Sequence, residues 1–500
     1  MFKLEYRLEL LIQEECKKLI RRYHQYHNYL HLEHKRNEER LIINSDKIIH
    51  KPDYWNIDSK FNPFYVKRKS KSIAKSIAKA IETRIYKPHP PFVRKIQKSD
   101  GGCREVSIYT IPDSVVSKLF YNRLLQKNKH RFSSFSYAYR NDRNVHFAIQ
   151  DVSVSLKENS RAFISEFDFS DFFGSISHQY LHDQYDKNGF LIGEEDKYVI
   201  NAFLETRERG IPQGTSISLF LANMVCWKLD RSFEKAGLKF ARYADDTIVW
   251  SDSYSSICRS FELISDFSNE AGVKVNTKKS DGISLLIKGD MPAEIHSKSA
   301  FNFLGYSIAV DKVSIKPNSV NKIKKQISYL LYKNLIQPLK QTPVNARLLP
   351  KPHGDKALLI ALAQIRRYMY GGLSTQDLID FLNGGSGRIY FKGIMSFYPL
   401  IDDEKQLKEL DGWLVSTVYR VIECRAKLVA SKTLVTYSCF PRGIPKNRFA
   451  IRMRRKRIMG LTLLEIPSFT LVYKVIKRGV TEIGIEKVMH PRSLDYDYSS

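Results

Sequence analysis

The sequence lacks the features that mark membrane-spanning, disulfide-bonded and zinc-binding proteins. No apolar run in its 500 residues approaches the roughly 20 residues that a membrane helix requires. None of the six cysteines forms a CxxC pair, so no zinc spacing is present and free thiols in a reducing compartment are expected. Met1–Lys18 mixes Glu and Lys into its apolar positions, so we expect no signal peptide. These absences predict a cytoplasmic protein with no membrane partner.

Acidic residues are scarce relative to basic ones. The chain has 81 Lys and Arg against 53 Asp and Glu, a formal net charge of +28. Because clustered basic side chains bind phosphates by releasing counterions, this excess predicts a nucleic-acid partner, with an anionic membrane surface as the alternative.

The densest basic run is Arg442–Arg457, which contains no acid. We expect its basic residues to bind nucleic acid, and a solvated helix face is the alternative. They are Arg442, Lys446, Arg448, Arg452, Arg454, Arg455, Lys456 and Arg457.

Apolar patterning predicts a mixed fold. The composition is globular, with 43% hydrophobic residues. Ala162–Phe169 is typical of a strand, and Phe240–Trp250 of two short strands that meet at a polar turn. Ile257–Ala271 has the spacing of an amphipathic helix, and the chain beyond about residue 320 is mainly helical in pattern. Such a mixture favours an α+β fold with helices on one face of a sheet.

Acidic residues stand at the ends of two of these strands. Asp245 and Asp246 lie in Arg242–Thr247, which reads RYADDT, and Asp168 comes near the end of Phe163–Phe169. Adjacent carboxylates repel, so either a bound divalent cation or a solvated turn explains the doublet. Carboxylates from neighbouring strands can hold two metal ions about 3.5–4 Å apart, the arrangement that supports in-line phosphoryl transfer. Oxygen ligands of this kind suit Mg²⁺.

These segments resemble the motifs of reverse transcriptases. Tyr243–Asp246 (YADD) resembles the YxDD motif of the family, and Asp168–Phe173 (DFSDFF) resembles its first catalytic motif. Arg209–Ser216 (RGIPQGTS), followed by Ser218 and by Leu221–Asn223 (LAN), resembles the family segment between those two. The order along the chain is that of the family.

Further segments extend the resemblance to about residues 90–310. Upstream, Lys98–Arg104 resembles the fingertip hairpin, and Ser136–Arg140 (SYAYR) resembles the SYGFR segment. Downstream, Val273–Ser280 (VKVNTKKS) is similar to the LNxxKT element and Phe301–Tyr306 to the FLGY strand. The sequence departs from the family at Ala138, Val275 and Ser280, where Gly, Leu and Thr are usual.

The resemblance implies a role for individual residues. Three catalytic aspartates and one backbone carbonyl would hold two Mg²⁺ ions, with Mn²⁺ as a substitute; these are Asp168, Asp245, Asp246 and the carbonyl of Phe169. The residues expected to bind the nucleotide substrate are Lys98, Arg104, Phe173, Gln213 and Lys279. Arg140 is expected to contact nucleic acid.

The roles of these substrate residues differ. Lys98 and Arg104 would neutralise the β and γ phosphates, with ordinary exposed cations on a hairpin as the alternative. Phe173 would lie under the sugar and exclude a 2′-hydroxyl, with a core aromatic as the alternative. Lys279 would act as a general acid toward pyrophosphate or only as a solvated charge.

The resemblance also implies a right-hand polymerase, an α+β fold with fingers, a palm built on a ferredoxin-like antiparallel sheet, and a thumb. We expect an N-terminal helical extension at residues 1–62, fingers at 63–160 and a palm with a finger–palm insert at 161–310. A thumb-like helical region at 311–400 and a basic C-terminal helical extension at 401–500 would follow.

The implied activity is RNA-templated DNA synthesis, with an RNA template, dNTPs and a DNA product. The core and helical tail most resemble the stand-alone defence-associated, abortive-infection-like reverse transcriptases of bacteria, relatives of retron and group II intron enzymes. Members of that group act against bacteriophage, and several work with a structured noncoding RNA. A retron-like or intron-maturase-type enzyme and a non-catalytic RNA-binding scaffold are the alternatives, and homo-oligomerisation stays open.

Overall fold

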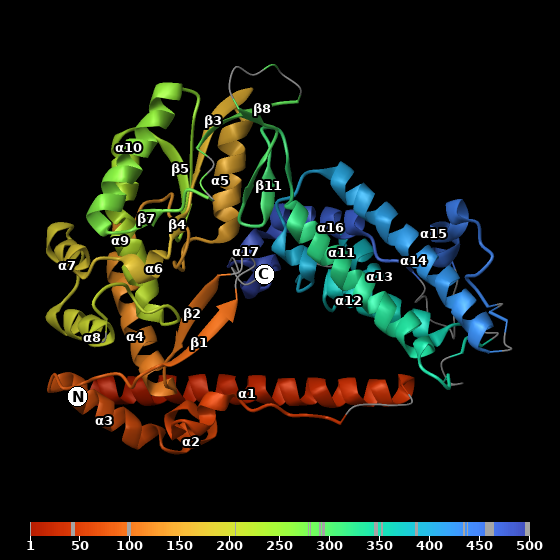
Figure 1. Cartoon of the computed structure of the whole chain (residues 1–500), viewed down its shortest axis with the longest axis horizontal. Helices are drawn as coiled ribbons and strands as arrows, with labels where there is room; N and C mark the ends of the chain where they lie inside the picture. Colours follow the sequence, from red (N-terminus) through yellow and green to blue (C-terminus); the bar gives the residue numbers. More distant parts are fainter. Residues whose placement is uncertain are drawn as a thin grey trace. The chain divides into compact units, whose positions relative to one another are not determined.

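A computed structural model of the chain divides into two compact units (Figure 1). Unit 1 comprises Met1–Leu30, Ile48–Ala148 and Asn159–Lys298, and unit 2 comprises His31–Lys47, Ile149–Glu158 and Ser299–Ser500. The structure describes residues 2–41, 46–97, 102–205, 207–278, 280, 282–289, 292, 296–344, 349–351, 354–385, 389–433, 436–437, 439–455 and 465–495. Two helices run across the boundaries of the units, α1 (Phe2–Arg40) and α5 (Val145–Lys157).

Unit 1 is built on a five-stranded sheet with the strand order β5-β6-β3-β8-β9. The strands are β3 (Arg161–Phe167), β5 (Lys239–Tyr243), β6 (Asp246–Ser251), β8 (Ile283–Ile287) and β9 (Ser297–Lys298). The central β3 runs antiparallel to β6 and β8, while β8 and β9 are parallel. Buried residues such as Ala162, Ile164 and Phe167 explain why β3 occupies the middle of the sheet.

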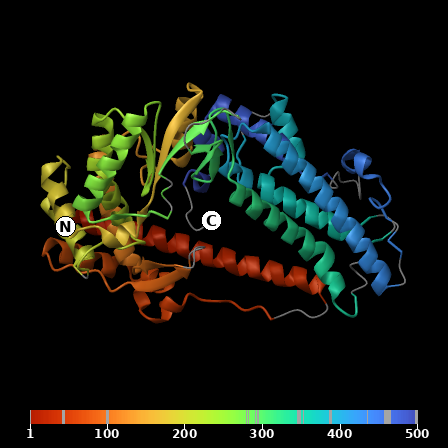
Figure 2. The same ribbon diagram turned by 45° about the horizontal axis from the view of Figure 1, so that its top comes forward.

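Helix α10 (Tyr254–Ala271) contacts β3 and β6 of this sheet (Figures 1 and 2). Ser253 caps its first turn by accepting a hydrogen bond from the Ser256 N–H, and Gly272 ends it at φ 72°. Its buried Ile257, Ile264 and Phe267 follow helical spacing, so one face of α10 packs on the sheet.

The other elements of unit 1 surround this core. Its helices are α2 (Pro63–Arg68), α3 (Ser70–Glu82), α4 (Ile111–Asn128), α6 (Phe172–Ser175), α7 (His178–Lys187), α8 (Glu194–Leu204) and α9 (Ser216–Lys235). Two antiparallel pairs complete it, β1 (Phe92–Gln97) with β2 (Cys103–Ile108) and β4 (Phe169–Ser170) with β7 (Lys274–Val275).

Unit 2 combines a small antiparallel sheet with helices. The strands are β10 (Phe301–Phe303), β11 (Tyr306–Ile308) and β12 (Val313–Ile315). The helices are α11 (Pro317–Leu331), α12 (Lys356–Tyr370), α13 (Thr375–Leu382), α14 (Glu404–Lys432), α15 (Lys446–Arg455), α16 (Phe469–Ile483) and α17 (Ile485–Val488).

The predicted fold class is confirmed, because antiparallel sheets and helices occur together along the chain. One predicted element is wrong in its extent. The strand expected at Ala162–Phe169 ends at Phe167, and Phe169 pairs with Val275 of β7 instead. The chain therefore changes its pairing partner at Asp168.

No helix within the described ranges is both long enough and apolar enough to cross a membrane. The six cysteines are free thiols, as expected.

Candidate active site

The sheet register brings the three predicted catalytic aspartates to one end of the five-stranded sheet. Phe167 of β3 pairs with Thr247 of β6, and the two strands are antiparallel. Asp168 is the next residue along β3, and Asp246 is the residue before Thr247. Because antiparallel neighbours advance in opposite directions, Asp168 and Asp246 leave this register pair on the same side. Asp245 lies in the adjoining turn.

The turn that carries Asp245 has an unusual backbone. Tyr243 pairs with Asp246, so Ala244 and Asp245 form a two-residue connection between β5 and β6. Ala244 has φ 59°, in the left-handed region. A residue with a Cβ adopts this conformation at a cost of about 1–2 kcal/mol, and such residues concentrate at functional sites.

Asp168 is held by the segment that follows α10. The Asn276 side chain donates a hydrogen bond to Oδ2 of Asp168 at 2.9 Å, and the Asn276 N–H donates to the Asp168 carbonyl at 2.8 Å. The Asp168 N–H donates to the Ser280 hydroxyl at 3.2 Å. These contacts fix the direction of the carboxylate. Asn276 was not predicted as a site residue, although the motif that contains it was recognised.

Phe173 lies against the loop that resembles the GIPQG segment. Its carbonyl accepts a hydrogen bond from the Ile211 N–H at 2.7 Å. Gly210 has φ 80°, and a Cβ there would come within 2.8 Å of the Phe173 carbonyl oxygen, so a glycine is needed at this contact. The Phe173 side chain is half-buried and packs edge-on against Phe172. Its function as a steric gate stays a prediction.

The same loop also joins the β1–β2 hairpin. The Gln213 carbonyl accepts a hydrogen bond from the Ser107 N–H at 2.7 Å. A Cβ on Gly214 would stand 2.5 Å from the Ser107 carbonyl oxygen, so the two backbones touch. The half-buried Arg104 lies three residues before Ser107 on β2. Gln213 and the strand that carries Arg104 are thus neighbours.

Tyr139 is an additional residue beside the carboxylates. Burial is the largest cause that raises the pKa of its phenol above the usual value, and the negative charge of Asp245 raises this pKa further. The positive charge of Arg104 acts in the opposite direction. The three side chains are therefore within electrostatic reach of one another. The segment SYAYR was recognised in the sequence, but Tyr139 itself received no role.

Arg140 of the same segment is bound within the protein. Its side chain is 4% exposed and donates hydrogen bonds to both carboxylate oxygens of Asp142, at 3.0 and 2.8 Å. It also donates to the carbonyls of Ser133 and Ser136, at 2.6 and 3.2 Å. Its expected contact with nucleic acid stays a prediction, and the structure gives it a bracing position.

Part of the basic run forms an amphipathic helix. On α15, Phe449 and Met453 are fully buried, whereas Lys446, Arg448 and Arg452 are exposed. Arg442 before the helix is also exposed and donates to the Tyr437 carbonyl at 2.6 Å. Arg454 and Arg455 end the helix, and their side chains lie outside the description. Lys98, Lys279, Lys456 and Arg457 lie outside the described residues altogether.

The donor atoms fit Mg²⁺ only with help from the substrate. Among the residues that the structure describes, no group of three or more His, Cys, Asp or Glu side chains is placed to hold a metal ion by itself. Mg²⁺ commonly takes one or two carboxylates and completes its octahedron with water and substrate phosphates. Aspartates at the ends of neighbouring strands, such as Asp168 and Asp246, match that kind of site.

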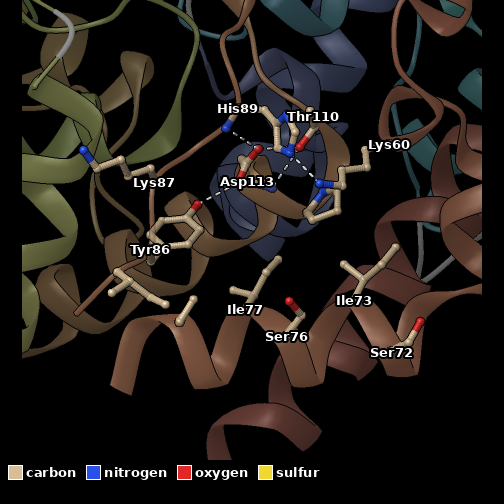
Figure 3. A pocket seen from close by; sticks show the side chains of 13 residues that line it. Lys60, Ser72, Ile73, Ser76, Ile77, Tyr86, Lys87, His89, Thr110 and Asp113 are labelled. Atoms are coloured by element: carbon tan, nitrogen blue, oxygen red, sulfur yellow. Dashed lines mark hydrogen bonds between the residues drawn. The ribbon is translucent and has the colours of Figure 1, made fainter. Parts of the chain in front are cut away.

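A separate hollow of about 310 Å³ opens beside α3 (Figure 3). The buried Asp113 accepts hydrogen bonds there from the Tyr86 hydroxyl at 2.8 Å and the Thr110 hydroxyl at 2.5 Å, and Lys60 contacts the His89 ring. Side chains of α3, including Ile73 and Ile77, form the opposite wall. None of the predicted site residues lines this hollow.

Comparison with known proteins identifies the domain that carries the carboxylates. Residues 96–308 match the family model for reverse transcriptase (RNA-dependent DNA polymerase). This span is therefore similar to reverse transcriptase domains. The match agrees with the predicted enzyme class, an RNA-directed DNA polymerase.

The curated relative and the solved structures are more distant. Protein YkfC of Escherichia coli (strain K12) is 25% identical over 179 residues, which cover 34% of this chain and 47% of that protein. The chain thus spans about half the length of the curated relative it matches. Telomerase from Candida albicans in complex with a fragment of telomeric RNA has 11% identity and a TM-score of 0.36, covering 76% of this chain and 68% of that one. A truncated apo telomerase from Candida tropicalis has 15% identity and a TM-score of 0.34, covering 49% and 60%.

Proposed function

We propose that the protein synthesises DNA on an RNA template with two divalent metal ions, Mg²⁺ or Mn²⁺. Asp168, Asp245, Asp246 and the carbonyl of Phe169 would hold the ions. The observation that supports this most is the pairing of Phe167 with Thr247, from which Asp168 and Asp246 leave the sheet on the same side. When bound, the metal pair stabilises charge on the attacking and leaving oxygens of the phosphoryl transfer.

The other residues of the site would bind and select the nucleotide. Arg104, with Lys98, would neutralise the triphosphate, since a guanidinium can bind phosphate oxygens through two hydrogen bonds. Phe173 would exclude ribonucleotides, and Gln213 would contact the nucleotide or the template. Lys279 would act as a general acid toward the departing pyrophosphate or only as a positive charge. Phe173 contacts the loop that carries Gln213, and Gln213 contacts Ser107 of β2, so these backbone contacts support a shared substrate-binding surface.

Purified protein with its retained nucleic acid, supplied with Mg²⁺ and labelled dNTPs, tests the polymerase. We expect metal-dependent DNA synthesis that is lost in an Asp245→Ala, Asp246→Ala double variant. Sequencing of the retained RNA and the product then identifies the template. If the wild-type protein makes no DNA even on a primed RNA template, the non-catalytic scaffold is favoured instead.

We further propose that the protein acts in bacterial antiphage defence with a structured noncoding RNA as template or scaffold. The resemblance of the core to defence-associated enzymes motivates this, and the exposed basic face of α15 supports binding of RNA. A retron-like or intron-maturase-type enzyme would use the same site with a different RNA, so the sequence of the retained RNA distinguishes these cases.

Charge reversal on α15 tests the contact with RNA. Lys446→Glu, Arg448→Glu and Arg452→Glu together should weaken RNA retention and reduce its dependence on salt, because each lost phosphate contact lowers the log–log salt slope by about 0.7 for single strands. The matched control reverses three exposed lysines of α14 (Lys405, Lys408 and Lys427). Unchanged retention in the α15 variant, or equal loss in both variants, would contradict an RNA contact at this helix.

A further inference from the structure

A fully buried arginine lies directly beneath the turn that carries Asp245. Arg242 is 0% exposed and forms a two-pronged ion pair with Asp230 of α9, which is also 0% exposed. Nε of Arg242 lies 2.7 Å from Oδ1 of Asp230, and Nη2 lies 2.6 Å from Oδ2. The two charges neutralise each other, so the pair acts on its surroundings through geometry more than through net charge.

The remaining donors of Arg242 reach three separate segments. Nη1 donates to the Ala244 carbonyl at 2.9 Å and to the side-chain oxygen of Asn223 at 3.3 Å. Nη2 donates to the Ser136 hydroxyl at 2.7 Å. Only a planar guanidinium has enough donors in a fixed fork to make these contacts together.

The partners of Arg242 are themselves anchored. The Asn223 amide donates to the Ala138 carbonyl at 2.8 Å. The Arg242 N–H donates to the Phe135 carbonyl at 2.9 Å, and the Tyr137 N–H donates to the Arg242 carbonyl at 3.0 Å. The guanidinium therefore rests on a rigid base made of α9 and the segment that precedes α5.

The surroundings of Arg242 keep its guanidinium charged. Burial is the largest single influence and lowers the pKa of Arg242, but the charge and hydrogen bonds of Asp230, together with Cys226 and Tyr139, raise this pKa above its ordinary value overall. The arginine thus keeps its charge, and its Nη1 stays a donor for the Ala244 carbonyl. That bond is made to a residue whose φ of 59° is unfavourable for alanine.

We propose that Arg242 is a positioning residue, which holds the Ala244–Asp245 turn in its left-handed conformation and so directs Asp245 toward the divalent metal ions. The proposal rests on the proposed function, in which Asp245 is a metal ligand. Without the contact from Arg242, the alanine turn relaxes toward ordinary backbone angles, and metal binding weakens although the sheet stays intact.

Binding of Mn²⁺ tests this proposal independently of catalysis. It is measured from the loss of the free-ion signal in electron paramagnetic resonance. Arg242→Lys keeps the charge but lacks the fork, and we expect about tenfold weaker Mn²⁺ binding, in the range seen when an outer contact of a metal ligand is lost. The matched control is Arg425→Lys, which alters the buried Arg425–Asp355 pair of unit 2 and should leave Mn²⁺ affinity unchanged.

A second substitution separates positioning of the turn from general loosening. Glycine adopts a positive φ without strain, so Ala244→Gly in the Arg242→Lys background should recover several-fold of the lost affinity. Unchanged affinity in Arg242→Lys, equal weakening in Arg425→Lys, or no recovery with Ala244→Gly would each overturn the proposal.

Three further outcomes also bear on the proposal. If Arg242→Lys does not fold, Ser136→Ala serves instead, because it removes one hydrogen bond of Arg242 and leaves the ion pair. We expect about two- to fivefold weaker Mn²⁺ binding in this variant. Unchanged affinity would overturn the proposal. A wild-type protein that binds no more Mn²⁺ than the Asp245→Ala, Asp246→Ala variant would also overturn it. Binding of Mn²⁺ without DNA synthesis would contradict only the proposed polymerase.

Discussion

Each unit of the molecule contains a buried arginine–aspartate pair, and the two pairs brace different kinds of backbone. In unit 1, Arg242 binds Asp230 and the carbonyl of a strained turn. In unit 2, Arg425 binds Asp355 at 2.7 Å and the Leu335 carbonyl at 2.8 Å. Asp355 also accepts hydrogen bonds from the first N–H groups of α12, so the second pair supports a regular helix.

The difference separates two uses of the same chemistry. A buried pair adds little net stability compared with apolar packing, yet loss of one member is strongly destabilising. The pair in unit 2 has only a structural effect on the described residues around it. The pair in unit 1 has a strained turn above it that carries a candidate metal ligand, so its loss should change function as well as stability.

The largest expected effect is the loss of either arginine by substitution with methionine. Arg425→Met and Arg242→Met each leave a buried carboxylate without its partner, which should destabilise the unit concerned by about 3–5 kcal/mol. Unfolding in urea, followed by tryptophan fluorescence, distinguishes the units. Trp413 is the tryptophan of unit 2, whereas Trp55, Trp227 and Trp250 belong to unit 1.

A Trp413→Phe background makes the fluorescence report on unit 1 alone. In that background Arg242→Met should lower the urea midpoint and Arg425→Met should leave it unchanged. Equal shifts of the urea midpoint in both variants would contradict the view that each pair stabilises only its own unit.

The next largest effect is expected for Asn276→Ala, which should weaken metal binding and leave stability nearly unchanged. This variant removes the hydrogen bond to Oδ2 of Asp168, and the loss of such a contact typically weakens metal binding about 10- to 100-fold. Because Asn276 is only partly buried, the urea midpoint should change little. Asn302→Ala, at an exposed position of β10, is the control. A fall in stability without a change in Mn²⁺ affinity would show that Asn276 stabilises the fold and not the metal site.

The smallest expected effect is that of Tyr437→Phe. The Tyr437 hydroxyl donates to Oδ2 of Asp355 at 2.9 Å, and removal of this hydrogen bond should cost about 1.5 kcal/mol. The Trp413 transition should move to lower urea while Mn²⁺ affinity stays at the wild-type value. Weaker Mn²⁺ binding in this variant would show that bracing of unit 2 affects the metal site.

Sequence patterns predicted the parts of the site that are local. The apolar strand before Asp168 and the acid doublet between two apolar segments are visible within a few residues, so the aspartates and their strands could be recognised. The strand end was missed, because local pattern does not reveal that Phe169 pairs with Val275, more than a hundred residues away.

Contacts between distant segments could not be read from the sequence. Arg242 stands beside the YADD motif, but its partners Asp230, Asn223 and Ser136 come from other parts of the chain. Arg140 shows the same limit, since the resemblance of its segment suggested a contact with nucleic acid but did not reveal that the folded chain surrounds it with carbonyls and Asp142.

Extension of a primed RNA template under single-turnover conditions, with Mg²⁺ titrated, tests the central claim most directly. Asp245→Asn is compared with Asp252→Asn, an exposed residue just beyond the opposite end of β6. We expect the wild-type protein and Asp252→Asn to extend the primer at the same metal-dependent rate, and Asp245→Asn to be slower by about a thousandfold or more. Extension by Asp245→Asn at the wild-type rate would contradict the assignment of the carboxylates.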